Sequence, residues 1–384
     1  MRDKIEYILK HNLWVLSLYK VVMSAAFRFL GLFVKTDENL ILYNSYMGNS
    51  KFDSPLAIFN YISSHPQYAK YRQVWAFSDP DNVDLDNCEK VKIDTLKYFI
   101  TALRAKYWVT NVNIERGLHF KKKNTIYLNT WHGVSLNVVG NDVPGRNDYD
   151  FSDINFLCYE SEFHKKVLMR AFKARESSML PSGLPRNDEL YNVTDQEIVE
   201  LKKKLGLPLD KKIIMYAPTW RDSADGGKTY QFLPPVNFKY WEERLGNNYV
   251  LILRTHHLTT KFMDIKYNDF VRDFVFYPRI NDLFKVSDIL ISDYSSCLTD
   301  FCILERPIIS FAYDYDEYAK ARGFNINFRK DFPNGIFSNE KDIINHIINM
   351  DYKLECSKTK KFKDTYTYIG GCATKICVES LINI

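Results

Sequence analysis

One histidine follows an apolar run, in a position suited to acid–base chemistry. His132 comes shortly after the strand predicted at 125–129, and Gly133 follows it directly. An imidazole titrates near neutral pH and can take a proton from an attacking hydroxyl, while a glycine lets a ligand approach the backbone. A single histidine beside a tryptophan is more often a hydrogen-bonded structural residue, however, and this motif taken alone favours that interpretation.

Two adjacent serines are suited to binding an anion. A second apolar run stops at a polar turn that contains Asp293, Ser295 and Ser296, as when a buried parallel strand ends in a turn that opens a helix. The first turn of a helix has unpaired N–H groups and a partial positive charge, so both serines are candidate phosphate ligands. A serine or Asp293 could equally well cap the helix expected at 296–304. Segment 306–317 repeats the plan of apolar strand and polar turn, which favours the ligand site.

Two arginines and a second histidine follow other apolar runs. Arg221 comes after the run 213–217, and Arg254 and His256 come after 249–253. The planar fork of arginine can hold a phosphate through two hydrogen bonds and can neutralise its charge. The sequence has no Walker-type loop, no GxGxxG, and no DxD or EF-hand pattern. We therefore expect no dinucleotide, no metal and no other cofactor.

The elements that must position these residues alternate between strand and helix, which predicts an α/β fold. A chain of 384 residues is long for one core and suits two domains. We expect an N-terminal Rossmann-like acceptor domain over 36–205 and a C-terminal Rossmann-like donor domain over 206–384. Two such domains facing a central cleft would bring His132 and His256 around one pyrophosphate.

Composition limits the partners and the compartment. The net charge of +5, without an arginine-rich tract, favours anionic partners and does not single out nucleic acid. The seven cysteines are odd in number, scattered and without a CxxC pair. This pattern indicates buried thiols in a reducing compartment, with neither disulfides nor zinc.

Residues 1–35 have the pattern of an amphipathic helix that lies in the plane of a membrane. Lys10, Lys20 and Arg28 interrupt the apolar residues, so no run reaches the roughly 18 residues that a spanning helix needs. On a helical wheel a narrow basic stripe lies opposite a wide apolar face that contains Trp14. This pattern favours an anionic bilayer surface over docking on the protein's own core. No small-residue cleavage site is present, so we expect no cleavable signal.

Six motifs, in this order, resemble those of the CDP-glycerol glycerophosphotransferase family, the teichoic acid primases and polymerases. They are TWHG at 130–133, SGLPRND at 182–188, YAPTWR at 216–221, RTH at 254–256, SDILISDYSS at 287–296 and the segment from RP at 306 to YDYDEY at 318. The resemblance implies a GT-B-like fold and a CDP-activated polyol phosphate donor. It also implies a polyprenyl diphosphate-linked saccharide acceptor at the cytoplasmic side of the cell membrane, to which the protein would bind peripherally.

The resemblance also implies roles for single residues. By matching position, the catalytic histidines of the family fall on His132 and His256, and its donor-phosphate ligands fall on Ser295 and Ser296. The further substrate contacts expected from these motifs are Thr130, Gly133, Arg221, Arg254 and Asp293.

The implied reaction is a direct displacement. His132 would remove the proton from an acceptor hydroxyl, which would attack the β-phosphorus of CDP-glycerol and release CMP. The acceptor would be a lipid-linked teichoic acid or capsule precursor. An alternative is a CDP-ribitol or other polyol-phosphate transferase or capsule polymerase, because Asn327 stands where an acidic residue is expected. A membrane scaffold without turnover is a third possibility, but a scaffold has no need of a base.

Overall fold

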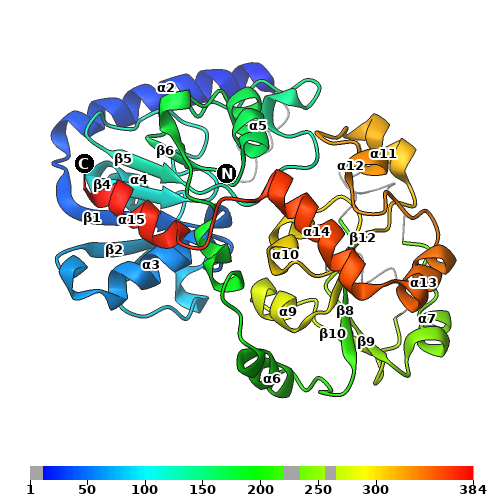
Figure 1. Cartoon of the computed structure of the whole chain (residues 1–384). Helices are drawn as coiled ribbons and strands as arrows, with labels where there is room; N and C mark the ends of the chain where they lie inside the picture. Colours follow the sequence, from blue (N-terminus) through cyan, green and yellow to red (C-terminus); the bar gives the residue numbers. More distant parts are fainter. Residues whose placement is uncertain (1–11, 220–233, 256–264, 384) are drawn as a thin grey trace.

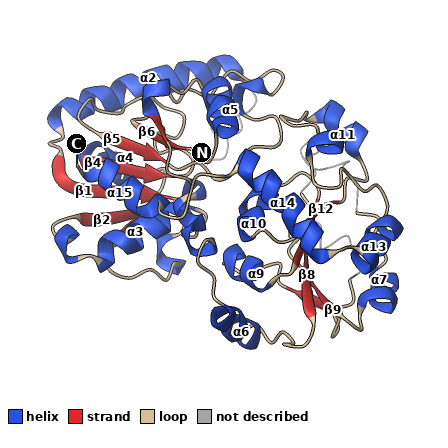
Figure 2. Cartoon of the chain, viewed as in Figure 1, coloured by secondary structure: helices blue, strands red, loops and turns tan. Residues whose placement is uncertain are grey.

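The computed structural model describes residues 12–219, 234–255 and 265–383, and its framework is two parallel β-sheets with helices on both faces (Figures 1 and 2). The α/β fold expected from the sequence is confirmed. Each sheet separates two hydrophobic clusters, because successive side chains of a strand point to opposite faces. In the first sheet, Leu40 and Leu42 belong to one cluster and Ile41 and Tyr43 to the other.

The first sheet has seven strands among the described residues. Their order is β3 (Glu89–Lys92), β2 (Arg72–Phe77), β1 (Asp37–Asn44), β4 (Ala105–Thr110), β5 (Ile126–Asn129), β6 (Phe156–Cys158) and β7 (Met179–Leu180). The short strands β3 and β7 were not expected, because neither has enough apolar residues for a clear pattern.

The second sheet has five strands among the described residues. Their order is β10 (Val271–Asp273), β9 (Tyr249–Leu253), β8 (Lys212–Tyr216), β11 (Ile289–Ser292) and β12 (Ile308–Ser310). The apolar and aromatic segment 274–277 is not a strand: β10 ends at Asp273 and a turn follows. Asp273 makes this turn by accepting a hydrogen bond from the Val275 amide at 2.9 Å.

Helices connect the strands and cover the sheets. They are α2 (Leu13–Phe33), α3 (Ser54–Ser64), α4 (Leu96–Arg104), α5 (Glu162–Phe172), α6 (Asp195–Lys204), α7 (Phe238–Leu245), α9 (Ile280–Val286), α10 (Cys297–Phe301), α11 (Tyr315–Ala321), α12 (Phe328–Asp331), α13 (Glu340–Asn349), α14 (Tyr352–Tyr366) and α15 (Ala373–Ile382). The last helix, α15, returns to the first sheet (Figure 1) and buries Cys377, Val378 and Leu381 in its core. All seven cysteines are free thiols, but only Cys158, Cys297, Cys302 and Cys377 are buried, whereas the sequence predicted burial for all of them.

Helix α2 lies along the first sheet's half of the molecule (Figure 1) and has one face bound to it. Phe27 is buried in the core, and the Arg28 Nε donates to the His119 carbonyl at 2.6 Å. The segment Trp14–Phe33 has a mean hydropathy of 1.5 and is long and apolar enough to cross a bilayer by length and composition. The sequence predicted that Lys20 and Arg28 exclude a membrane-spanning helix, but by this criterion they do not.

Candidate functional site

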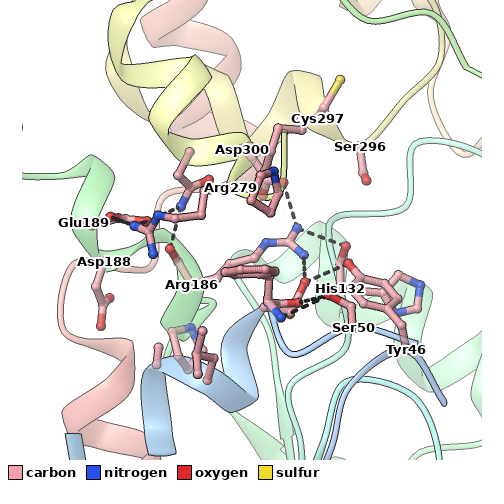
Figure 3. A pocket seen from close by; sticks show the side chains of 18 of the residues that line it. Tyr46, Ser50, His132, Arg186, Asp188, Glu189, Arg279, Ser296, Cys297 and Asp300 are labelled. Carbon is pink, nitrogen blue, oxygen red and sulfur yellow. Dashed lines mark hydrogen bonds and ion pairs between the residues drawn. The ribbon is translucent and has the colours of Figure 1, made fainter. Parts of the chain in front are cut away.

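A pocket of about 740 Å³ collects side chains from the carboxyl ends of strands in both sheets (Figure 3). Tyr46 follows β1 and His132 follows β5 in the first sheet, whereas Arg254 follows β9 and Ser296 follows β11 in the second. Parallel sheets bind ligands at this edge, because strand ends and helix starts present polar groups there. The structure thus brings together His132, Arg254, Ser295 and Ser296, as the sequence predicted.

The tautomer of His132 is set by one hydrogen bond. Its Nδ1 lies 2.8 Å from the carbonyl oxygen of Asn111, which can only accept, so Nδ1 carries the proton. Nε2 therefore keeps its lone pair. Burial lowers the pKa of His132 below its usual value, and the Asn111 carbonyl and the Asp53 carboxylate only partly oppose this effect. A neutral imidazole with one free lone pair can act as a general base.

Gly133 places the histidine loop directly against the serine turn. Its φ is 137°, in a region that side chains disfavour, and a Cβ on it would lie 2.8 Å from the Ser296 Oγ. Only glycine allows the His132 backbone to approach Ser296 this closely. The requirement for glycine at this position is one of packing between the two loops.

The serine turn leaves one hydroxyl without a capping role. The Ser295 Oγ accepts from the Cys297 amide at 3.3 Å, whereas Ser296 is the N-cap residue of α10 but makes no side-chain capping bond. Asp293 does not cap α10 either, because its Oδ1 accepts from the amides of Thr219 and Tyr294 at 2.9 and 2.7 Å. Asp293 therefore stabilises the backbone of the turn through these hydrogen bonds, and it is not among the residues that line the pocket.

The remaining predicted residues differ in where they lie. Arg254 lines the pocket, where burial lowers its pKa, and among the described residues its guanidinium has no ion-pair partner. Thr130 is fully buried, donates to the Trp131 carbonyl at 3.0 Å and does not line the pocket. Arg221 and His256 lie outside the described residues.

A buried ion cluster at the floor of the pocket was missed in the sequence. The Arg186 guanidinium contacts the Asp53 carboxylate at 2.5 Å and the Asp300 carboxylate at 2.7 Å, and its Nη2 donates to the His132 carbonyl at 3.0 Å (Figure 3). Asp53 begins helix α3 of the first half, and Asp300 lies in α10 of the second. One cation therefore links both halves and the loop that carries His132. Arg186 lies in the SGLPRND motif, but its partners are too distant in sequence to be recognised there.

Burial and charge act in opposite directions on this cluster. Burial alone raises the pKa of Asp53, but Arg186 and the Ser54 amide outweigh it, so the net shift is downward. For Asp300 burial prevails over Arg186, and its pKa is raised. Burial, followed by the charge of Asp300, also raises the pKa of nearby Glu160 to about 8. The three carboxyl groups therefore differ: the pKa of Asp53 is lowered, whereas burial raises that of Asp300 and of Glu160.

Comparison with known proteins identifies the family. The family described as CDP-Glycerol:Poly(glycerophosphate) glycerophosphotransferase matches residues 26–375. The teichoic acid poly(glycerol phosphate) polymerase of Bacillus spizizenii is 31% identical, and the match covers 100% of both chains. The polymerase of the same description from Staphylococcus epidermidis is 37% identical over 81% of this chain, but the chain spans only 45% of that relative's length. The teichoic acid ribitol-phosphate polymerase TarL of Staphylococcus aureus is 28% identical over 69% of this chain and 49% of its own.

Solved structures agree with the sequence comparison. The structure of the wall teichoic acid polymerase TagF superposes with a TM-score of 0.83 at 30% identity, covering 100% of this chain and 98% of that one. A TagF variant soaked with CDPG superposes with a TM-score of 0.82, with the same coverage. The chain belongs to the CDP-glycerol glycerophosphotransferase family and is an enzyme of the transferase class.

Proposed function

We propose that this chain transfers glycerol phosphate from CDP-glycerol to a hydroxyl of a lipid-linked teichoic acid or capsule precursor and releases CMP. The observation that carries the proposal is the shared pocket of about 740 Å³. There a neutral His132, with a free Nε2, lies beside two serine hydroxyls and Arg254. A base next to an anion site is what a phosphoryl transfer requires.

The two halves would act as separate domains that face this pocket. Residues 36–205 would form the acceptor domain and residues 206–384 the donor domain, with helix α15 of the latter packed on the former. The support for this division is that each sheet has its own pair of hydrophobic clusters. Both domains would be Rossmann-like and together GT-B-like.

His132 would start the reaction from the acceptor side. Its Nε2 takes the proton of the acceptor hydroxyl as the oxygen attacks the β-phosphorus of CDP-glycerol. The bond between that phosphorus and the oxygen of CMP breaks, so CMP departs with the bonding electrons. A pKa lowered by burial keeps the imidazole unprotonated at neutral pH.

The opposite wall would hold the phosphates. Hydrogen bonds from Ser295, Ser296 and the Arg254 guanidinium can stabilise the charge that develops on the transferred group and on the leaving CMP. Arg254 is suited to this role, because no carboxylate among the described residues neutralises it. His256 and Arg221 would complete this wall, and Thr130, Gly133 and Asp293 would position it.

The exposed apolar face of α2 would bind the cytoplasmic side of the cell membrane. Trp14 is 88% exposed and Leu18 is 65% exposed, although both are large and apolar. Because Phe27 is part of the core, deletion of this helix would damage the fold, so point variants are the better test. Replacing Trp14 and Leu18 by serine should abolish sedimentation with phosphatidylglycerol vesicles. Phe276→Ser, at another exposed apolar site, serves as the control and should leave sedimentation unchanged.

The donor could instead be CDP-ribitol or another CDP-polyol, a candidate favoured by the similarity to a ribitol-phosphate polymerase. Purified protein is incubated with a polyprenyl diphosphate-linked disaccharide and either CDP-glycerol or CDP-ribitol, and CMP release is measured. Release from CDP-glycerol alone supports the proposal, and release from CDP-ribitol alone supports the alternative. Release from neither would indicate a scaffold that binds without turnover.

A further inference from the structure

A second cavity, of about 1050 Å³, lies between α2 and the loop that follows the catalytic histidine. Its walls include Lys20 and Arg28 of α2, Arg146 of the loop, and Trp131 and His132 at its inner end. His132 lines this cavity as well as the pocket described above. We infer that this second cavity binds the phosphate-bearing head of the acceptor, so we call it the acceptor cavity. The inference rests on the proposed transferase function and deepens it.

The charges that line the acceptor cavity favour an anion. The lining has three carboxylates, and each is already engaged. Asp148 makes a two-bond ion pair with Arg146, Glu115 accepts hydrogen bonds from two backbone amides, and Asp150 accepts one from the Ser152 amide at 2.9 Å. Burial raises the pKa of Glu115, and the amides of Phe120 and Lys121 partly oppose this shift. Four cations of the lining have no salt-bridge partner among the residues that the structure describes. They are Lys20, Arg28, Lys173 and Arg322.

This excess positive charge selects a phosphodiester or diphosphate over a neutral sugar. Cations spread along a cavity match a ligand with several phosphates at intervals, such as a chain of polyol phosphate units. The aromatic rings of Trp131, Tyr149 and Phe172 form an apolar wall against which the carbon skeleton of such a chain can pack.

The position of α2 connects the acceptor cavity with the membrane. Ser17, Lys20, Ser24 and Arg28 recur every three or four residues and line the cavity as one stripe of the helix. The adjacent stripe is the exposed apolar face. Val21 belongs to both, because it lines the cavity and is 64% exposed. An acceptor whose lipid tail remains in the bilayer could therefore pass its head along this edge to His132.

This arrangement gives the two substrates separate entrances to one base. The donor phosphates would lie against the serine turn in the first pocket, and the acceptor hydroxyl would reach His132 from the acceptor cavity. Separate entrances would let the enzyme hold CDP-glycerol while an acceptor chain exchanges.

The test uses the full chain and a soluble, fluorescently labelled glycerol phosphate oligomer, whose binding is measured by anisotropy without CDP-glycerol. Lys173→Glu with Arg322→Glu reverses two exposed charges of the cavity without altering α2. The matched control, Lys341→Glu with Lys353→Glu, makes the same charge change at exposed sites on α13 and α14. We expect oligomer affinity to fall roughly tenfold in the cavity variant only. The affinity for CDP-glycerol should stay within about twofold in both variants.

Other results would overturn the inference. These are no oligomer binding by the wild type, equal binding by the cavity variant and the wild type, or equal losses in both charge-reversed variants. Weaker binding of phosphatidylglycerol vesicles with unchanged oligomer binding would make the cavity a lipid-headgroup site instead. Failure of the proposed function would look different: the wild type would bind the oligomer through Lys173 and Arg322 but release no CMP from CDP-glycerol in its presence.

Discussion

Removal of the Arg186 charge should destabilise the protein more than any exposed ion pair could. The side chains of Arg186, Asp53 and Asp300 are only 12%, 3% and 7% exposed, so Arg186→Met leaves two buried carboxylates without their cation. Breaking a buried ion pair from one side typically costs about 3–5 kcal/mol. Each carboxylate keeps a neutral donor, Asn187 for Asp300 and the Ser54 amide for Asp53. We therefore expect a loss near the lower limit, about 3 kcal/mol in the free energy of unfolding.

The loss should depend on pH in a predictable direction. Burial already raises the pKa of Asp300 in the wild type, and removal of Arg186 raises it further. A carboxyl group whose pKa is higher in the folded than in the unfolded protein contributes its full stability below the unfolded-state pKa. This contribution is lost as the pH rises through the folded-state pKa. The penalty of Arg186→Met should therefore be smaller at about pH 5 than at about pH 8.

Urea unfolding followed by circular dichroism measures both effects. The control is Arg272→Met, which removes an ion pair with the fully exposed Asp269 and should cost less than about 0.5 kcal/mol. A loss below about 1 kcal/mol for Arg186→Met, or the same loss at both pH values, would refute the view that Arg186 neutralises two buried charges.

Three further predictions concern the pocket and the carboxyl group beneath it. Gly133→Ala should reduce turnover about tenfold. The φ of this residue is 137° and the new Cβ would meet the Ser296 Oγ, so the substitution introduces a strain of roughly 1–3 kcal/mol. Turnover equal to that of the wild type would show that the two loops need not touch. Ser296→Ala should raise the KM for CDP-glycerol and leave the acceptor KM unchanged, and the opposite pattern in steady-state kinetics would assign the hydroxyl to the acceptor. The stability of Glu160→Gln relative to the wild type should increase as the pH rises from the ordinary glutamate pKa towards about 8. In that pH window Glu160 ionises in the unfolded wild type but not in the folded one, so ionisation stabilises only the unfolded state. Parallel curves of melting temperature against pH for these two proteins would contradict the raised pKa.

The sequence predicted the sheets well where strands are apolar and buried. The runs before His132 and Ser295 could be recognised, and so could the polar turns after them, because a parallel strand and its end have a local pattern. The start of α3 is ambiguous in the sequence, because Asp53 and Ser54 are both suited to capping; in the structure Asp53 accepts the capping hydrogen bond. Strands β3 and β7 lacked a pattern altogether.

The candidate site was predictable only in part, because half of it depends on contacts distant in the sequence. The sequence indicated that His132 and the serines belong to strand ends, but not that Gly133 contacts Ser296. The Arg186 cluster joins residues that are more than 100 positions apart, and no local pattern shows such a pairing. The sequence predicted a basic stripe on the N-terminal helix opposite its apolar face, but not that Lys20 and Arg28 of this stripe line a cavity of the protein. The packing of Phe27 into the core sets the rotation of the helix, and no local pattern shows that contact.

The most direct test of the proposed role of His132 is the rate of CMP release by His132→Ala, measured together with the affinity for CDP-glycerol. If Nε2 is the base, turnover should fall about a hundredfold or more while the Kd for CDP-glycerol stays within about twofold. Turnover that remains at the wild-type level, or a loss that is fully explained by weaker donor binding, would contradict the role of His132 as the base.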